Sequence, residues 1–308
     1  MKIAVPDLIS NSYFPVVAAV ELGCFKEEGI DAEIELVFPV DKAYAHLKAE
    51  KVDFVGGSAH SAVAAFPDWD GVKLLCAQAQ GMYWFLIMHA DYDVKRGDID
   101  AVKGRKIGAA PWVELGLRRL LREANIDVQR DRVDIAPVPS PHGEISVNFG
   151  LNAAKALEAR QIDGFWANGM GAEVALSRGV GTVVLDVRRG DGPSSCFNYT
   201  MASLATADRL ISSNPAAAEG AIRAVVKAQA ALRRDVTLAT KVANKLFPKS
   251  EAALIEKLIQ RDLPYYDASI SKGFVAGMSQ FSLDMGITTR EVGYGHVVAE
   301  RFSHLWAP

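Results

Sequence analysis

Cysteine is scarce in this sequence, with only Cys24, Cys76 and Cys196 among 308 residues. Three thiols are too few for a disulfide framework, and an odd number leaves at least one unpaired. We therefore expect free, buried thiols, with a single bridge as the alternative. Positive charge is not in excess either, because 34 Lys and Arg face 37 Asp and Glu and the net charge is −3. This balance lacks the basic surface of a nucleic-acid-binding protein, so we expect no nucleic-acid partner.

Long apolar runs are also missing. The longest candidate, residues 82–88, is far shorter than the ~18–20 residues that a membrane span requires, so we expect no direct membrane insertion. The first residues lead directly into a strand pattern and lack the apolar core of a secretory leader. We expect a cytoplasmic location if Met1 is the native start, and a periplasmic one if a leader preceded this sequence and was removed.

What the sequence does contain is an alternation of short β-rich segments with amphipathic helical ones. It predicts an α/β fold in which mostly parallel sheets are flanked by helices. Strands are expected at residues 2–5, 32–38, 52–55, 73–78, 83–88, 107–109, 133–138, 164–167 and 182–186. Helices are expected at residues 14–22, 42–49, 59–66, 111–124, 151–159, 169–177, 215–234, 250–261 and 270–285.

The distribution of these patterns predicts two lobes. After residue 208 only helical patterns follow, so the C-terminal helices are expected to pack on a sheet that the earlier segments form. We expect lobe I to comprise residues 1–82 and 200–308, and lobe II to be residues 83–199, inserted into it. Two predictions concern single helices. Gly56 and Gly57 are expected to open the helix at 59–66 and to let the backbone approach a ligand. Pro111 is expected in the first turn of the helix that ends at residue 124.

Four segments in order resemble the NMT1/THI5-like and SsuA-like solute-binding proteins of ABC importers. They are residues 23–31 (GCFKEEGID), 51–54 (KVDF), 102–108 (VKGRKIG) and 161–166 (QIDGFW). Each pattern is weak alone, but together they extend the resemblance over essentially the whole chain. It implies the type II periplasmic-binding-protein fold, a two-lobe clamshell that closes on a small solute. It also implies an ABC permease as partner, and we expect a monomer.

Candidate ligand-binding residues follow from where open α/β sheets bind ligands, which is beyond the carboxyl ends of their strands. Four turns of this kind carry polar or aromatic side chains: Asn11, Ser12 and Tyr13; Ser58, His60 and Ser61; Trp112 and Glu114; and Trp166 and Asn168. The two expected connections between the lobes add Gln80, Tyr83 and Asn198.

Each candidate also has a purely structural interpretation. Asn and Ser cap helices, Glu114 can complement a helix dipole, and Trp166 can fill a core. As a binding site, aromatic walls with a few amides and hydroxyls predict a small aromatic or heterocyclic ligand. No Arg or Lys occurs in these four turns, which disfavours an obligate sulfonate or phosphate. We expect Trp112→Ala and Trp166→Ala to weaken ligand binding and to leave the melting temperature of the ligand-free protein unchanged.

Catalytic signatures are lacking, since no His-Glu-x-x-His, Cys-x-x-Cys or Walker A motif occurs. We expect no catalytic residues, no metal and no cofactor. The resemblance does include enzymes that make a thiamin pyrimidine precursor from pyridoxal phosphate with a Lys, a His and a Cys-rich run. Here the Lys position falls near Gly57, the His at His60 or Ser61, and the Cys-rich run retains only Cys196. Such an enzyme, and a cytosolic ligand sensor without a transporter, are the alternatives to transport.

Overall fold

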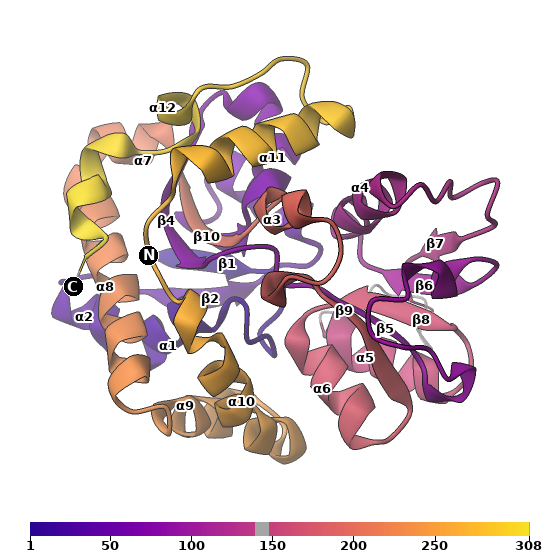
Figure 1. Cartoon of the computed structure of the whole chain (residues 1–308). Coiled ribbons are helices and arrows are strands. Elements are labelled where there is room, and N and C mark those ends of the chain that lie inside the picture. Colours follow the sequence, from indigo (N-terminus) through magenta and orange to yellow (C-terminus); the bar gives the residue numbers. More distant parts are fainter. Residues whose placement is uncertain (139–147, 308) are drawn as a thin grey trace. The chain divides into compact units, whose positions relative to one another are not determined.

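A computed structural model describes residues 1–138 and 148–307 (Figure 1). The chain divides into two compact units, which we describe separately. Unit 1 comprises Met1–Gly81 and Asn198–Pro308, and unit 2 is Met82–Phe197. The boundaries expected from the sequence lie one residue from the first junction and two from the second. Asn198 therefore belongs to unit 1.

Unit 1 is built on a mixed five-stranded sheet in the order β2-β1-β3-β10-β4. Strand β1 pairs in parallel with β2 and β3, whereas β10 runs antiparallel to β3 and β4. Four strands thus point one way and β10 points the other. The sequence does not predict β10, because its residues Ala-Ser-Leu-Ala-Thr-Ala are mostly small and have weak strand propensity. The strands are β1 (Lys2–Val5), β2 (Glu33–Leu36), β3 (Phe54–Ser58), β4 (Val72–Ala79) and β10 (Ala202–Ala207).

The helices of unit 1 cover this sheet. Figure 1 shows the long helix α8 (Pro215–Arg234) beside α1 (Phe14–Glu21) and α2 (Cys24–Glu27), which it contacts. Pro215 occupies the first turn of α8, and Asn214 caps it by accepting a hydrogen bond from the Ala217 N–H at 3.1 Å. The remaining α-helices are α3 (Val40–Lys48), α7 (Asp208–Ser213), α9 (Leu238–Leu246), α10 (Lys249–Asp262), α11 (Lys272–Asp284) and α12 (Tyr294–Val297).

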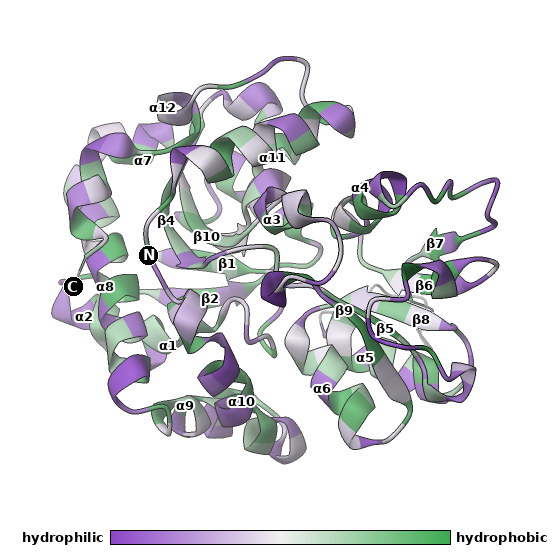
Figure 2. Ribbon diagram, viewed as in Figure 1, coloured by the Kyte–Doolittle hydropathy of each residue, from purple (hydrophilic) through white to green (hydrophobic). Residues whose placement is uncertain are grey.

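Unit 2 repeats this plan with a five-stranded sheet in the order β7-β6-β8-β5-β9. Here β5 is the reversed strand, antiparallel to β8 and β9, while β6 is parallel to β7 and β8. Figure 2 shows apolar residues concentrated in the sheet strands and polar ones on the outer helix surfaces. The elements are β5 (Phe85–His89), β6 (Lys106–Ala109), α4 (Glu114–Glu123), β7 (Asp134–Ala136), α5 (Phe149–Glu158), β8 (Gly164–Ala167), α6 (Gly169–Ser177) and β9 (Gly181–Asp186).

Two local predictions are wrong. Gly56, Gly57 and Ser58 belong to strand β3, and the segment after them, Ala59–Ala64, is a 3₁₀-helix. The glycines serve packing: a Cβ on Gly56 would lie 2.8 Å from Val16 Cγ1 of α1, and one on Gly57 would lie 3.1 Å from Val40 of α3. They let two helices approach the sheet, which is a different role from the ligand approach expected.

The second error concerns Pro111. Helix α4 begins at Glu114, so Pro111 lies outside its first turn. The intervening Trp112 has a positive φ of 69°, which is incompatible with a helical start at that point.

All three cysteines are free and buried, as expected. Burial raises the pKa of the Cys76 thiol. Across residues 1–138 and 148–307, no helix has both the length and the apolar character needed to cross a membrane.

Candidate functional site

The candidates of unit 1 lie at one edge of its sheet. Strands β1 and β3 are parallel neighbours, so the loop after each begins at the same edge. The first residue of β10, Ala202, pairs with both Ser58 and Ala79, which brings the start of β10 and the end of β4 to that edge as well. The eight residues that this topology gathers are Asn11, Ser12, Tyr13, Ser58, His60, Ser61, Gln80 and Asn198.

Asn11 and Ser12 are buried polar residues whose side-chain oxygens lack a partner. Asn11 Nδ2 donates to Asp262 Oδ2 at 2.6 Å, which fixes the orientation of the amide. Asn11 Oδ1 and Ser12 Oγ have no hydrogen-bond partner among the described residues, although the two residues are only 1% and 0% exposed. Buried polar atoms are normally paired, so we expect water or a ligand to supply the partner of these two oxygens.

Ser58, His60 and Ser61 form a small polar network. The Ser58 and Ser61 hydroxyls lie 2.6 Å apart, and Ser61 Oγ lies 3.4 Å from His60 Nε2. The His60 ring also packs edge-on against Phe281 at 5.5 Å. The N–H groups that open this turn are used inside unit 1: Ala59 N donates to the Met201 carbonyl at 2.9 Å, and His60 N donates to Thr200 Oγ1. The side chains, rather than a free helix N-terminus, are what this turn offers to a ligand.

The other unit 1 candidates, Tyr13, Gln80 and Asn198, are buried or contact other segments of unit 1. Tyr13 is buried and immediately precedes α1. Gln80 Nε2 donates to the carbonyls of Asp267 and Ser269 at 2.8 and 2.7 Å, so its donors hold the α10–α11 connection. Asn198 is half-buried and packs so closely on α11 that a Cβ on Gly277 would lie 2.6 Å from its own Cβ.

The candidates of unit 2 share an edge in the same way. Strands β6 and β8 are parallel neighbours, so the turns that follow them adjoin. Phe85, the first residue of β5, pairs with Ala167 and Asp186, which places the start of β5 and the end of β9 at this edge. Tyr83, Trp112, Glu114, Trp166 and Asn168 are gathered here.

Trp112 and Trp166 behave differently. Trp112 is half-buried and adopts left-handed backbone geometry, which is strained for a bulky residue and is characteristic of functional sites. Trp166 is 0% exposed, and its indole N–H donates to the Val113 carbonyl at 3.1 Å. Its ring also packs against Trp84 at 6.0 Å. The structure gives Trp166 a packing role that supports the Trp112 turn, and on this ground we expect its removal to lower the stability of the ligand-free protein, unlike the expectation from the sequence. Contact of either ring with a ligand stays a prediction.

Asn168 and Glu114 have structural roles as well. Asn168 Oδ1 caps α6 by accepting hydrogen bonds from the N–H groups of Met170 and Gly171 at 3.1 and 3.3 Å. Glu114 is the first residue of α4, where a carboxylate complements the helix dipole. Both remain candidates for ligand contact.

Sequence reasoning missed Arg188, a buried cation at the edge of unit 2. It follows β9, is 3% exposed, and its guanidinium lies 5.5 Å from the ring centre of Tyr83. The signal was present, because Arg188 is the second residue after the strand predicted at 182–186. A fifth strand-to-turn position therefore adds a positive charge to the candidates.

No metal site accompanies these residues in the part of the chain that the structure describes, where no cluster of three or more His, Cys, Asp or Glu side chains could hold an ion. The Gly57 position, where the enzymatic resemblance puts a lysine, faces Val40 and Tyr44 of α3.

Solved structures share this fold. A protein from Bordetella bronchiseptica RB50 matches with a TM-score of 0.78 and 19% identity, covering 98% of this chain and 95% of that one. The alkanesulfonate-binding protein SsuA from Xanthomonas axonopodis pv. citri, bound to MOPS, matches with a TM-score of 0.73 and 14% identity, covering 96% and 97%. A variant of the desulfurization enzyme DszB in complex with biphenyl-2-sulfinic acid matches with a TM-score of 0.66 and 14% identity, covering 98% and 97%.

These likenesses define the fold as the two-lobe α/β fold of periplasmic binding proteins. The family model described as NMT1/THI5 like matches residues 10–235, and the chain belongs to that family. No curated protein matches the chain in sequence. The resemblance seen in the four sequence segments is thereby confirmed.

Proposed function

We propose that this protein is the solute-binding component of an ABC importer, and that it binds a small aromatic or heterocyclic molecule. Membership of the NMT1/THI5-like family and the binding-protein fold support the general role. A permease as partner, a periplasmic location and a monomeric state are parts of the same proposal.

Asn11 carries the proposal about the ligand. Because Asp262 fixes the Asn11 amide nitrogen, the atom left for a ligand is the oxygen, which can only accept a hydrogen bond. A ligand that satisfies it must present an N–H or O–H group. Sulfate, nitrate and an ionised sulfonate group present only acceptors, and they would also meet the carboxylate of Asp262 beside Asn11. We infer a neutral or weakly charged ligand that carries a hydrogen-bond donor.

Arg188 supports a second candidate, an organic anion. Its buried guanidinium would favour a carboxylate or sulfonate on the ligand. A donor-bearing heterocycle would bind mainly through Asn11 of unit 1, and an organic anion would bind mainly through Arg188 of unit 2. Matched variants therefore separate them. Asn11→Leu should abolish binding of a donor-bearing heterocycle, and Arg188→Gln should abolish binding of an organic anion.

Native mass spectrometry of the purified protein tests the general role, because it weighs any small molecule that remains bound. We expect a bound organic compound that is displaced by denaturation and is lost in Asn11→Leu. The exposed residue Asn244 of α9 provides the control, Asn244→Leu, which should retain the compound. Formation of a thiamin pyrimidine precursor from pyridoxal phosphate by the purified protein would contradict the binding role. Permease and ATPase genes beside this gene would favour transport over a sensor.

A further inference from the structure

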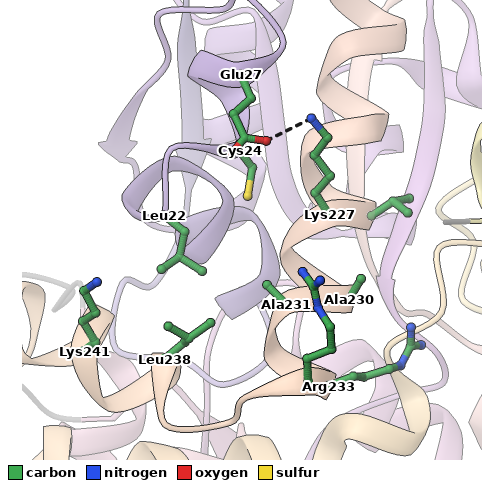
Figure 3. Close-up of a pocket in the computed structure, with 11 residues that line it drawn as sticks. Leu22, Cys24, Glu27, Lys227, Ala230, Ala231, Arg233, Leu238 and Lys241 are labelled. Atoms are coloured by element: carbon green, nitrogen blue, oxygen red, sulfur yellow. Dashed lines mark hydrogen bonds and ion pairs between the residues drawn. The ribbon is translucent and has the colours of Figure 1, made fainter.

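Unit 1 contains a second recess, away from the strand ends described above. It lies where the segment after α1 and helix α2 face the C-terminal half of α8 and the start of α9 (Figure 3). Its volume of about 860 Å³ falls within the range of about 300–1,000 Å³ typical of small-molecule sites. Nothing in the proposed import function requires this groove.

The groove combines an apolar floor with a basic rim. Leu22, Val226, Ala230, Ala231 and Leu238 supply the floor, and the Cys24 thiol adjoins them. Figure 3 shows Leu22 and Leu238 between Lys241, at the left of the view, and the α8 residues Lys227 and Arg233. The cations that line the groove are Lys227, Arg233, Arg234 and Lys241, and the only lining carboxylate is Glu27. Four positive charges against one negative charge contrast with the net charge of −3 of the whole chain.

Internal ion pairs account for only one of these cations. Lys227 Nζ lies 3.0 Å from Glu27 Oε2 and 2.8 Å from Glu28 Oε1. Arg233, Arg234 and Lys241 form no ion pair or side-chain hydrogen bond with any described residue. All three are exposed, so solvent screens their mutual repulsion, and an anion held among them would interact favourably with all three charges.

The helix dipole of α8 accounts for the positions of two of these three cations. Arg233 and Arg234 end α8, where positive charge is favourable. Lys241 lies in the first turn of α9 (Leu238–Leu246), where the helix dipole disfavours a cation. The helix dipole therefore does not account for the position of Lys241.

We propose that this groove binds an amphiphilic organic anion, with its apolar chain on the Leu22–Leu238 floor and its charged head near Arg233, Arg234 and Lys241. The shared chemistry is a single carboxylate, sulfonate or phosphate group on an aliphatic body. Such a molecule can come free from solution or from the anionic lipids of a membrane.

Titration calorimetry with decanoate below its micelle concentration tests the proposal, with decanol and decyltrimethylammonium as uncharged and cationic probes. We expect decanoate to bind more tightly than either, and its affinity to fall with added salt. The triple variant Arg233→Ala, Arg234→Ala, Lys241→Ala should lose about tenfold in affinity, as three exposed charge contacts of ~0.5 kcal/mol each predict. Lys249→Ala, which changes an exposed lysine outside the groove, should bind like the unaltered protein.

Cys24 supplies an independent readout inside the groove. It is 6% exposed, whereas Cys76 and Cys196 are 0% exposed and serve as internal controls. Decanoate should slow alkylation of Cys24 by iodoacetamide in the unaltered protein, with a weaker effect in the triple variant. Sedimentation with vesicles containing phosphatidylglycerol distinguishes a lipid source from a free anion. Equal binding of decanol and decanoate, unchanged affinity in the triple variant, or no protection of Cys24 would each overturn the proposal.

Discussion

Asn11 and Asp262 lie 251 positions apart in the sequence, yet the Asn11 amide nitrogen donates to an Asp262 carboxylate oxygen across 2.6 Å in the interior of unit 1. This contact joins the loop after β1 to the end of α10 and leaves the Asn11 carbonyl oxygen without a partner among the described residues. The proposed ligand chemistry follows from this arrangement, since the contact determines which atom of Asn11 is left for a ligand.

Replacing the Asn11 amide with a carboxyl group should make the stability of the fold depend on pH, because Asp262 lies beside it. In Asn11→Asp two carboxyl groups would face each other in a buried site, and the pKa of the pair would rise because like charges disfavour ionisation. Raised folded-state pKa values destabilise the fold where the unfolded carboxyls are ionised. The variant should therefore be least stable near neutral pH and should regain stability as the pH falls toward about 4. Melting temperatures from pH 4 to 8 check this, and a constant difference from the unaltered protein would contradict it.

Trp112 offers a way to separate backbone strain from side-chain function. Trp112→Gly removes the ring and allows the positive φ, so the ligand-free protein should be about 1 kcal/mol more stable than Trp112→Ala. Trp112→Ala removes the ring but keeps the strain, and serves as the matched control. If the ring contacts ligand, both variants should bind more weakly than the unaltered protein. Thermal melts and calorimetry measure the two effects, and a large loss of stability in Trp112→Gly would identify the ring as core.

Trp166 should prove structural. Trp166→Ala empties a fully buried site and should cost about 3–5 kcal/mol in the free energy of unfolding. Trp166→Phe keeps most of the packing but leaves the Val113 carbonyl without its donor, and should cost about 1–2 kcal/mol. Chemical denaturation checks both values. If Trp166→Ala unfolds at the same denaturant concentration as the unaltered protein, the packing role is wrong.

Even an alanine side chain at position 56 should destabilise the fold. Gly56→Ala places a Cβ 2.8 Å from Val16 Cγ1 of α1, and overpacking of this kind costs about 1–3 kcal/mol. The double variant with Val16→Ala removes the clashing methyl group and should be less destabilised than the sum of the two single changes. A double-mutant cycle measures this coupling, and simple additivity would show that the contact does not explain the glycine.

The Glu28 carboxyl should make the free energy of unfolding depend on pH. Burial alone would raise the pKa of the Glu28 carboxyl, but hydrogen bonds from Lys227 and Arg223 outweigh that effect and lower it. A lowered pKa contributes stability above the unfolded value of about 4.3, and this contribution is lost as the pH falls through the folded value. Glu28→Gln should therefore cost about 1 kcal/mol at pH 7 and less at pH 3. Unfolding curves at both pH values check this, and a deficit that is equally large in acid would exclude the charge as its cause.

The sequence predicts the fold where local signals agree. Helices α6 and α8 have the bounds expected from the sequence, because Pro215 and a run of helix-forming residues mark α8, and Asn168 marks the start of α6. No local sequence signal predicts strand β10, because its small residues form a strand only through pairing with β3 and β4. Mostly parallel sheets were expected, and one reversed strand in each makes both sheets mixed.

The candidate site was predictable only in part. The rule that ligands lie beyond strand ends selects residues that the topology gathers at one edge of each sheet. It cannot reveal that Asp262 fixes Asn11, because that contact joins distant segments. Nor does it show that the oxygen of Asn168 is used to cap α6, or that the backbone of Trp112 is left-handed. These features depend on tertiary packing rather than on local pattern.

A thermal-shift panel tests the central claim about the ligand most directly. It compares amino-substituted heterocycles, aromatic sulfonates and the inorganic ions sulfate and nitrate, on the unaltered protein and on Asn11→Leu. We predict that donor-bearing heterocycles raise the melting temperature of the unaltered protein and not that of Asn11→Leu. Stabilisation by the oxyanions alone, to the same extent in both proteins, would contradict the account.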